Sequence, residues 1–281
     1  MLFRSATGAV LWAGHVTADA LQMSATSLEA VMDAIGGFPT GATTFTGIGP
    51  GSMAIHTGTA GTVLTTFGSF LQGSVAADAR VIAFSQVASI TDTLVADNRV
   101  FTFANAAAND ITLGDDAVAA DAVSRLSSVN LSPVVRFTNP AVLLQLNAGV
   151  ADDRVTVNTL DARSAAGGTF GATVLIRGET GNDAVNASAS TNDLVMEGNE
   201  GDDWMVGGSG NDVIFGNAGN DTITSGIGND VVLGDSGQLD YVGGDLRTIA
   251  STASGVGGSD NIRSEEHTSE LQSLAYLVCR L

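Results

Sequence analysis

The feature that most constrains the fold is an aspartate that recurs every nine residues in the last third of the chain. Asp203, Asp212, Asp221 and Asp230 belong to the units GNEGDDWMV, GGSGNDVIF, GNAGNDTIT and SGIGNDVVL, which fill residues 198–233. Glycine stands at position four of every unit, aspartate at position six and an apolar residue at position eight. Such units favour a tight turn followed by a short strand, so they predict a solenoid in which two units make one coil.

The aspartate signature continues upstream at wider spacing. Asp193 and Asp183 extend the series at intervals of ten residues, each followed two residues later by valine. A fainter repeat with an offset of 30 aligns Asp153 with Asp183, and one with an offset of 43 aligns Asp110 with Asp153. We interpret Asp110 and Asp153 as ordinary surface turn residues. The predicted fold is all-β: a parallel β-roll, which is a right-handed β-solenoid, preceded by a β-rich, solenoid-like region with at most a short helix.

The rest of the chain divides into regions with weaker signals. We predict a β-rich region of unknown role over residues 6–140, degenerate β repeats over 141–177 and the β-roll over 178–233. Residues 234–262 are interpreted as a break followed by the start of a second array at Asp260, with Asp235 among the solvated acids of the break.

Local patterns predict individual elements before the roll. A capping box formed by Thr26 and Glu29, with Gly36 as a stop signal, predicts a short helix over Ser24–Ile35. Strands are predicted at Val81–Phe84, Val100–Phe103, Val134–Phe137 and Val142–Leu146.

The two ends of the chain have a different character. Residues 263–281 begin RSEEHTSELQS, which resembles an in-frame translation of a common short-read sequencing adaptor, and MLFRS at residues 1–5 resembles the reverse-strand adaptor end. We therefore predict that both ends are artefacts. The only cysteine, Cys279, lies in this tail, so the stretch that we predict to be genuine has none.

Two units per coil would place alternate aspartates on the same side of the roll. The same-side pairs 183/203, 193/212, 203/221 and 212/230 would then stack about 4.8 Å apart and hold up to four ions. Carboxylates that close repel each other by roughly 3 kcal/mol at an effective dielectric near 20, so a bare column opposes folding. Glycine at positions one, two or four would permit positive φ, and asparagine at position five (Asn211, Asn220, Asn229) would tolerate left-handed geometry.

A hard divalent cation between the coils would reverse this repulsion. Ca²⁺ accepts about six to eight oxygen ligands from carboxylates and carbonyls, whereas Mg²⁺ demands a smaller octahedral shell. The array contains no His or Cys, which argues against zinc or copper. The formal charge of −19 also argues against nucleic acid and anionic membranes as partners. The sequence therefore predicts calcium as the bound ion.

These units resemble the repeats-in-toxin (RTX) family, the hemolysin-type calcium-binding nonapeptide repeats of secreted bacterial proteins. GGSGNDVIF matches every defined position of G-G-x-G-x-D-x-U-x, and the other units depart at position one or two. The resemblance implies that turn carbonyls and the position-six aspartates hold Ca²⁺. It assigns metal binding to Asp203, Asp212, Asp221 and Asp230, and by extension to Asp193 and Asp183.

The resemblance also implies a setting for the chain. It suggests a fragment of a large secreted, extracellular protein, exported by type I secretion, whose β-roll folds on binding Ca²⁺ in a structural or adhesin-like role with an unknown cell-surface or matrix partner. The alternative is an accessory calcium-binding module of a secreted hydrolase or polysaccharide lyase. No H-E-x-x-H, G-x-S-x-G or phosphate-binding glycine loop is present, so we expect no enzymatic activity and assign no catalytic residue. A pore-forming toxin and membrane insertion are disfavoured because no long apolar run exists.

Overall fold

The structure is a computed structural model of the 281-residue chain. It describes the backbone of residues 2–5, 10–13, 21–25, 28–33, 43–56, 59–78, 80–118, 121–129, 133–161, 170–242, 245–251, 258–263 and 276–278. Side chains are described for residues 59–78, 81–118, 121–129, 133–161, 170–237 and 258–263. The fold is all-β and the main sheet is mixed, mostly parallel and nearly closed like a solenoid, with no helix in the described ranges. Those ranges also contain no helical segment suited to crossing a bilayer.

The chain forms two compact units. The first contains residues 1–105, 109–146 and 160–172, and the second contains residues 106–108, 147–159 and 173–281. The strands up to β12 belong to the first unit, and β13 (Leu143–Val150) has residues in both. The first unit's strands are β1 (Leu2–Ser5), β2 (Val10–Ala13), β3 (Leu21–Ala25), β4 (Leu28–Asp33), β5 (Thr43–His56), β6 (Thr59–Ser69), β7 (Gln72–Ala77), β8 (Arg80–Asp92), β9 (Val95–Phe103), β10 (Asp110–Asp115), β11 (Val123–Ser128) and β12 (Val134–Thr138).

The predicted helix over Ser24–Ile35 is wrong. This stretch contributes to β3 and β4, and both strands pair in parallel with β5. A helix of this length is marginal in water by itself, so the ladder hydrogen bonds offered by a long neighbouring strand outweigh the capping signals. Three of the four predicted strands lie within β8, β9 and β12, and the fourth overlaps β13, which begins one residue later, at Leu143.

Aromatic rings and one buried ion pair fill the core of the first unit. The rings of Phe67 and Phe103 lie 4.7 Å apart, and those of Phe101 and Phe137 lie 4.9 Å apart. Arg99 is only 1% exposed, and its Nη1 donates to Asp92 Oδ2 at 2.6 Å. Its other nitrogens donate to backbone carbonyls at 2.6 and 2.7 Å, so the buried charge is paired and hydrogen-bonded.

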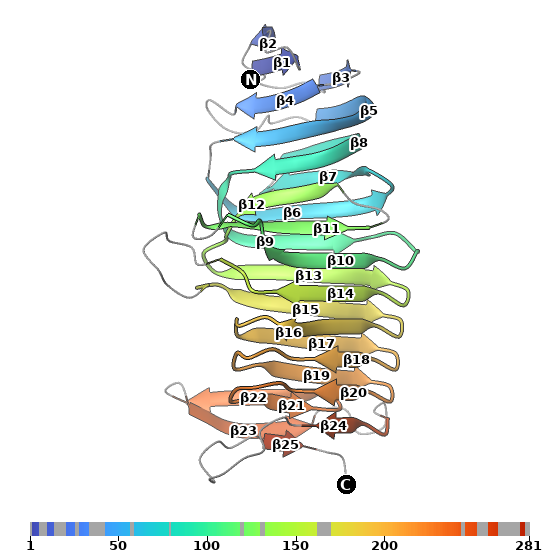
Figure 1. The fold of residues 1–281 in the computed structure, drawn as a ribbon, viewed down its shortest axis with the longest axis vertical. Helices are drawn as coiled ribbons and strands as arrows, with labels where there is room; N and C mark the ends of the chain where they lie inside the picture. The colour runs from blue at the N-terminus through green and yellow to red at the C-terminus, as the bar shows by residue number, and fades with distance from the viewer. Residues whose placement is uncertain are drawn as a thin grey trace. The chain divides into compact units, whose positions relative to one another are not determined.

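The second unit contains the predicted roll and extends beyond its predicted bounds of 178–233 (Figure 1). Its strands are β14 (Arg154–Asn158), β15 (Thr173–Thr180), β16 (Ala184–Ala189), β17 (Leu194–Glu200), β18 (Trp204–Val206), β19 (Val213–Ala218), β20 (Thr222–Thr224), β21 (Val231–Leu233), β24 (Asn261–Arg263) and β25 (Tyr276–Val278). Each strand pairs in parallel with the second strand along, as β16 does with β18 and β18 with β20. Two units therefore make one coil, as the repeat predicts.

Position-eight side chains form the core of the roll. Met205, Ile214 and Ile223 are completely buried, and Val232 is 4% exposed. Met205 is level with Ile223, and Ile214 with Val232, so the apolar column continues from coil to coil. The alternation of buried and outward-facing residues follows from the two-residue period of a strand.

The predicted break after Leu233 is an insertion. β22 (Gly237–Val242) and β23 (Asp245–Ser251) pair with each other as an antiparallel two-stranded sheet separate from the main one. β24 then returns and pairs in parallel with β20, with Ile262 level with Ile223. Asp260 therefore continues the first array and does not start a second one.

Candidate calcium site

The turns of the roll require glycine for two different reasons. At position four, Gly201 and Gly219 have φ of +132° and +138°, a conformation that L side chains rarely adopt. At position one, Gly198 and Gly216 have no positive φ, but a Cβ there would collide with the carboxylate at position six and with a carbonyl of the next coil. Glycine thus leaves a small space between each position-six carboxylate and the next coil.

The position-six aspartates stack in columns inside the roll. The amide N–H of Asp183 donates to Oδ1 of Asp203 at 2.7 Å, and that of Asp203 donates to Oδ1 of Asp221 at 2.8 Å. On the other side of the roll, the amide of Asp212 donates to Oδ1 of Asp230 at 2.9 Å. All five of these residues are 2% exposed or less. The predicted pairs 183/203, 203/221 and 212/230 therefore stack as expected.

The second oxygen of several of these carboxylates lacks a hydrogen bond. Among the residues whose side chains are described, Oδ2 of Asp183, Asp203 and Asp221 is buried and has no hydrogen-bond partner. Each of these oxygens lies against the position-one glycine of its own unit. At Gly198 and Gly216, a backbone carbonyl of the next coil lies beside the same glycine. A buried oxygen acceptor without a donor is costly, and a cation between carboxylate and carbonyl oxygens satisfies it.

Burial raises the pKa of these carboxyl groups. It raises the pKa of Asp203 to about 7 and that of Asp183, Asp212 and Asp221 to about 6, opposed by the amide hydrogen bonds that each accepts. The negative charges of neighbouring aspartates raise these pKa values further. The folded columns thus resist ionisation unless a positive charge joins them.

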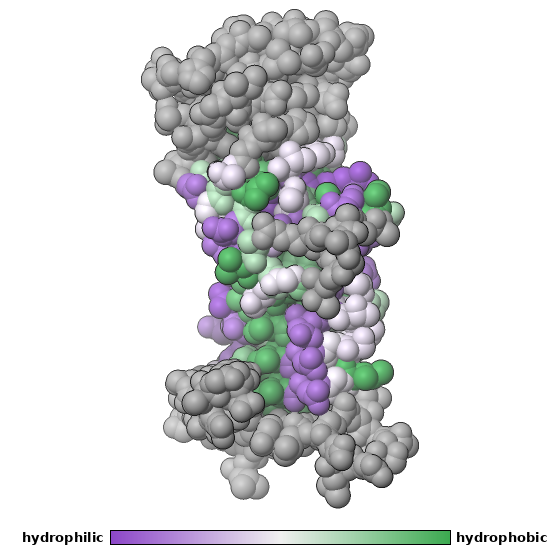
Figure 2. All heavy atoms as spheres, turned by 90° about the vertical axis from the view of Figure 1, so that its left-hand side faces the viewer, coloured by the Kyte–Doolittle hydropathy of each residue, from purple (hydrophilic) through white to green (hydrophobic). Residues whose placement is uncertain are grey.

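Position five has a role that the sequence did not reveal. The predicted left-handed geometry of its asparagines is wrong, because the positive φ angles lie at positions two and four, as at Asn199 and Asn217. Position-five side chains form a ladder instead: Asn220 N donates to Asp202 Oδ1 at 2.7 Å, and Asn229 N donates to Asn211 Oδ1 at 2.9 Å. These side chains are exposed, and Figure 2 shows hydrophilic residues forming a column across the roll.

The expected stacking of Asp193 over Asp212 is wrong. Val195 lies level with Val213, so Leu194 occupies position six of this unit, and its amide donates to Asp212 Oδ1 at 2.9 Å. Asp193 is exposed and joins the position-five ladder by accepting a hydrogen bond from Asn211. The ten-residue spacing therefore moves this carboxylate out of the column, and the buried apolar residue of the unit is Met196 in place of Val195.

Two further aspartates join the column that the sequence assigned to Asp183, Asp203 and Asp221. Asp153 N donates to Asp183 Oδ1 at 2.7 Å, and Asp221 N donates to Asp260 Oδ1 at 3.0 Å. The interpretation of Asp153 as a surface residue is wrong, because it is only 2% exposed. The signal was present in the 30-residue offset that aligns Asp153 with Asp183. The column thus contains five aspartates in four successive pairs.

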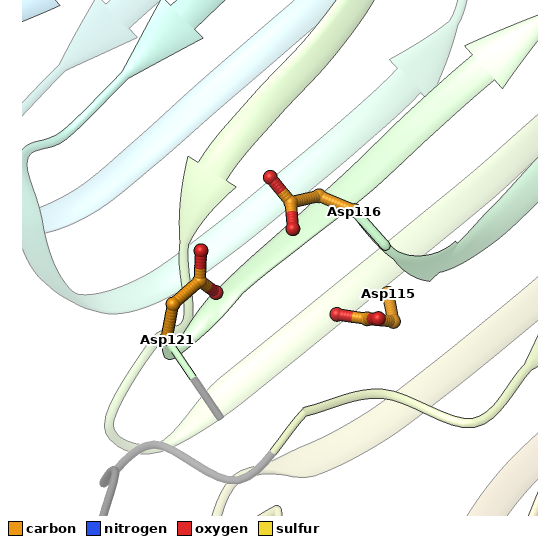
Figure 3. Close-up of side chains that lie close together, drawn as sticks. All are labelled: Asp115, Asp116 and Asp121. Atoms are coloured by element: carbon orange, nitrogen blue, oxygen red, sulfur yellow. The ribbon is translucent and has the colours of Figure 1, made fainter. Parts of the chain in front are cut away.

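A smaller acidic cluster lies in the first unit (Figure 3). Asp115 ends β10, Asp116 follows it and Asp121 precedes β11, and one carboxylate oxygen from each lies within 4.8 Å of the others. Arg136 Nε lies 3.7 Å from Asp116 Oδ2, and burial together with the charge of Asp161 raises the pKa of Asp115. No sequence period pointed to this cluster.

Comparison with known families agrees with the geometry of the roll. Residues 197–232 match the model of the RTX calcium-binding nonapeptide repeat, in four copies. These coils are RTX repeats. The matched RTX segment includes Asp203, Asp212, Asp221 and Asp230, while Asp153, Asp183 and Asp260 lie outside it. Neither the comparison with curated proteins nor that with solved structures found a match.

Proposed function

We propose that the second unit binds Ca²⁺ between its coils and that this binding drives its folding. The observation that carries the proposal is the set of buried Oδ2 atoms of Asp183, Asp203 and Asp221, which among the described side chains have no hydrogen-bond partner. Carboxylate and carbonyl oxygens around them match the ligands that Ca²⁺ prefers. The RTX repeats at residues 197–232 support the same ion.

The residues that would hold the ions are the position-six aspartates of the two columns. They are Asp153, Asp183, Asp203, Asp221 and Asp260 on one side, and Asp212 and Asp230 on the other. Bound Ca²⁺ supplies the positive charge that offsets repulsion between stacked carboxylates. Because the columns exist only when the coils are stacked, the free energy of metal binding is also free energy of folding.

This coupling suggests where the protein works. Extracellular modules bind Ca²⁺ at about 10⁻⁴–10⁻³ M, far above the free concentration in a cytosol. The roll would therefore stay unfolded inside the cell and fold on reaching a calcium-rich exterior. RTX proteins are typically secreted, which supports an extracellular location for this chain. A rod of stacked coils suits a structural, adhesin-like part of a secreted protein.

A calcium titration of the full chain tests the proposal. Circular dichroism should show β structure rising with Ca²⁺, and calorimetry should show several ions bound per chain. Mg²⁺ should act only at much higher concentration, because it holds its own waters and demands octahedral geometry. A β signal that ignores Ca²⁺, or responds equally to Mg²⁺, would contradict the proposal.

A further inference from the structure

The turn that ends at Asp212 differs from the turns on the other side of the roll in how its carboxylate is hydrogen-bonded. Both oxygens of Asp212 accept a backbone amide: Oδ1 accepts Leu194 N at 2.9 Å, and Oδ2 accepts Gly208 N at 2.9 Å. In Asp203 and Asp221, Oδ1 accepts a backbone amide, while Oδ2 has no hydrogen-bond partner among the described residues. The oxygen that is available to a cation in those turns is therefore already hydrogen-bonded at Asp212.

The backbone conformation at position two explains this difference. Asn217, at position two of the turn that ends at Asp221, has φ of +76°, and its amide donates to the carbonyl of Gly234 in the next coil at 2.8 Å. Gly208 occupies position two of the turn that ends at Asp212, and its φ lies outside the left-handed region. Its amide therefore donates within its own turn, to the carboxylate that a cation would need.

Gly208 can adopt both conformations because it has no side chain. A Cβ at this residue would collide with the carbonyl oxygens of Ser190 and Ala187, so the observed turn admits only glycine. Glycine populates positive φ about as readily as negative φ, so the conformation of Asn217 is also open to it. The turn at Gly208 therefore has two accessible states, and only one of them leaves Asp212 Oδ2 without a donor.

We propose that Gly208 is a switch that controls calcium binding at Asp212. When its amide turns away, Ca²⁺ binds Asp212 Oδ2 and the carbonyl oxygen of Ser225, which both lie against the position-one glycine, Gly207. When the amide donates to Oδ2, its partial positive charge opposes a cation at the same oxygen. The inference rests on the proposed function, because it assumes that position-six carboxylates bind Ca²⁺. It adds a residue that sets the calcium affinity of one side of the roll.

The switch predicts that the two sides of the roll fill in order. Calcium binding at Asp212 requires the loss of a hydrogen bond to a charged group, whereas binding at Oδ2 of Asp203 or Asp221 requires no such change. A hydrogen bond of that kind corresponds to a factor of about ten or more in affinity. Ca²⁺ should therefore bind the column that contains Asp203 first and Asp212 second.

The test is a Ca²⁺ titration of the full chain, followed by NMR at backbone amides. The unchanged chain should respond in two steps: the roll takes its folded signals in the first, and residues 207–212 and 225–230 shift in a second step at about tenfold higher Ca²⁺. Gly208→Asn introduces the residue that Asn217 provides at position two, and its side chain does not fit the observed turn. In this variant the second midpoint should fall to the first. Gly171→Ala is the control and should keep both steps, because a Cβ there meets no atom within 4 Å.

Several results would overturn the inference in distinguishable ways. A single midpoint for residues 200–203 and 207–212 in the unchanged chain would show that the sides do not fill in order, while the proposed function would stand. A second midpoint that Gly208→Asn leaves in place or raises would show that Gly208 is not the switch. If Gly208→Asn does not fold, Asp212→Asn decides: it should abolish the second step and keep the first, and any other result would contradict the inference. If no part of the unchanged chain responds to Ca²⁺, the inference and the proposed function both fail.

Discussion

The two oxygens of a position-six aspartate have different surroundings. In Asp203, Oδ1 accepts the amide of Asp183, while Oδ2 is buried without a donor from the described residues. One oxygen therefore orders the stack, and the other is available to a cation. An amide side chain keeps the first acceptor and removes the charge, so substitution by asparagine separates the two roles.

Asp203→Asn should weaken calcium binding without loosening the roll. Asp203 belongs to two stacked pairs, so we expect the Ca²⁺ midpoint to rise roughly tenfold, which corresponds to about 1.4 kcal/mol. In EDTA the variant should show at least as much β structure as the unchanged chain, because burial raises the pKa of Asp203 to about 7 and its charge therefore opposes folding. Circular dichroism, in EDTA and during a Ca²⁺ titration, measures both effects. An equal midpoint in Asp203→Asn and Asp202→Asn would contradict the assignment.

The pH dependence follows from the same carboxyl groups. Their folded pKa values of about 6 to 7 exceed the ordinary aspartate pKa of 3.8, so the folded roll binds more protons than the unfolded chain between these limits. In EDTA, folding of the roll should therefore become more favourable as the pH falls from 7 towards 4, so its β structure should increase. Protons also compete with the cation, so the Ca²⁺ midpoint should rise over the same range. Circular dichroism in EDTA across pH checks the first effect, and a β signal that falls between pH 7 and pH 5 would contradict it.

At the scale of the element, the register of each turn decides which residue enters the column. The sequence predicted positions six and eight correctly in the regular units, because nine-residue spacing fixes the register. It failed at Asp193, where one extra residue moves Leu194 into position six. It also missed the position-five ladder, because those hydrogen bonds join residues 18 apart and exist only between stacked coils.

Leu194→Asp should add a calcium site. A carboxylate at this position would stand over Asp212, which already stacks on Asp230. We expect one more Ca²⁺ per chain by calorimetry and less β structure in EDTA, because the new charge is buried and Leu194 is only 1% exposed. Leu194→Asn serves as the matched control, since it carries no charge and should add no ion. If Leu194→Asp leaves the number of bound ions unchanged, a carboxylate at position six in the correct register is not sufficient to form a calcium site.

Gly216→Ala should destabilise the roll for steric reasons. A Cβ at this position would collide with the carboxylate of Asp221 and the carbonyl of Gly234. Overpacking of this kind costs about 1–3 kcal/mol, so the thermal midpoint of the second unit should fall. Gly171→Ala is the control, because a Cβ there meets no atom within 4 Å. Equal midpoints for the two variants would show that the turns have more room than the structure indicates.

At the scale of the whole molecule, the two units owe their stability to different interactions. The first is stabilised by packed aromatic rings and by the buried ion pair of Arg99 and Asp92. Neither interaction needs a metal ion, because the buried charge is already paired. The second has narrow coils with an apolar core and two columns of acids. Sequence reasoning found the second unit because it repeats. It could only call the first β-rich, and it placed a helix where β3 and β4 pair with β5 over long sequence distances.

Removal of calcium should therefore unfold the second unit alone. Hydrogen exchange on the full chain in EDTA should show amides of residues 173–233 losing protection, while those of β6, β9 and β12 keep theirs. Added Ca²⁺ should restore protection cooperatively, because each aspartate in the middle of a column serves two neighbouring sites. Arg99→Met provides the converse change: it leaves Asp92 buried without its ion-pair partner, at a cost of about 3–5 kcal/mol to the first unit. The Ca²⁺ midpoint of residues 173–233 should not move in that variant. If both units lose protection together on adding EDTA, calcium stabilises the chain as one cooperative body. The first unit would then depend on metal as the second does.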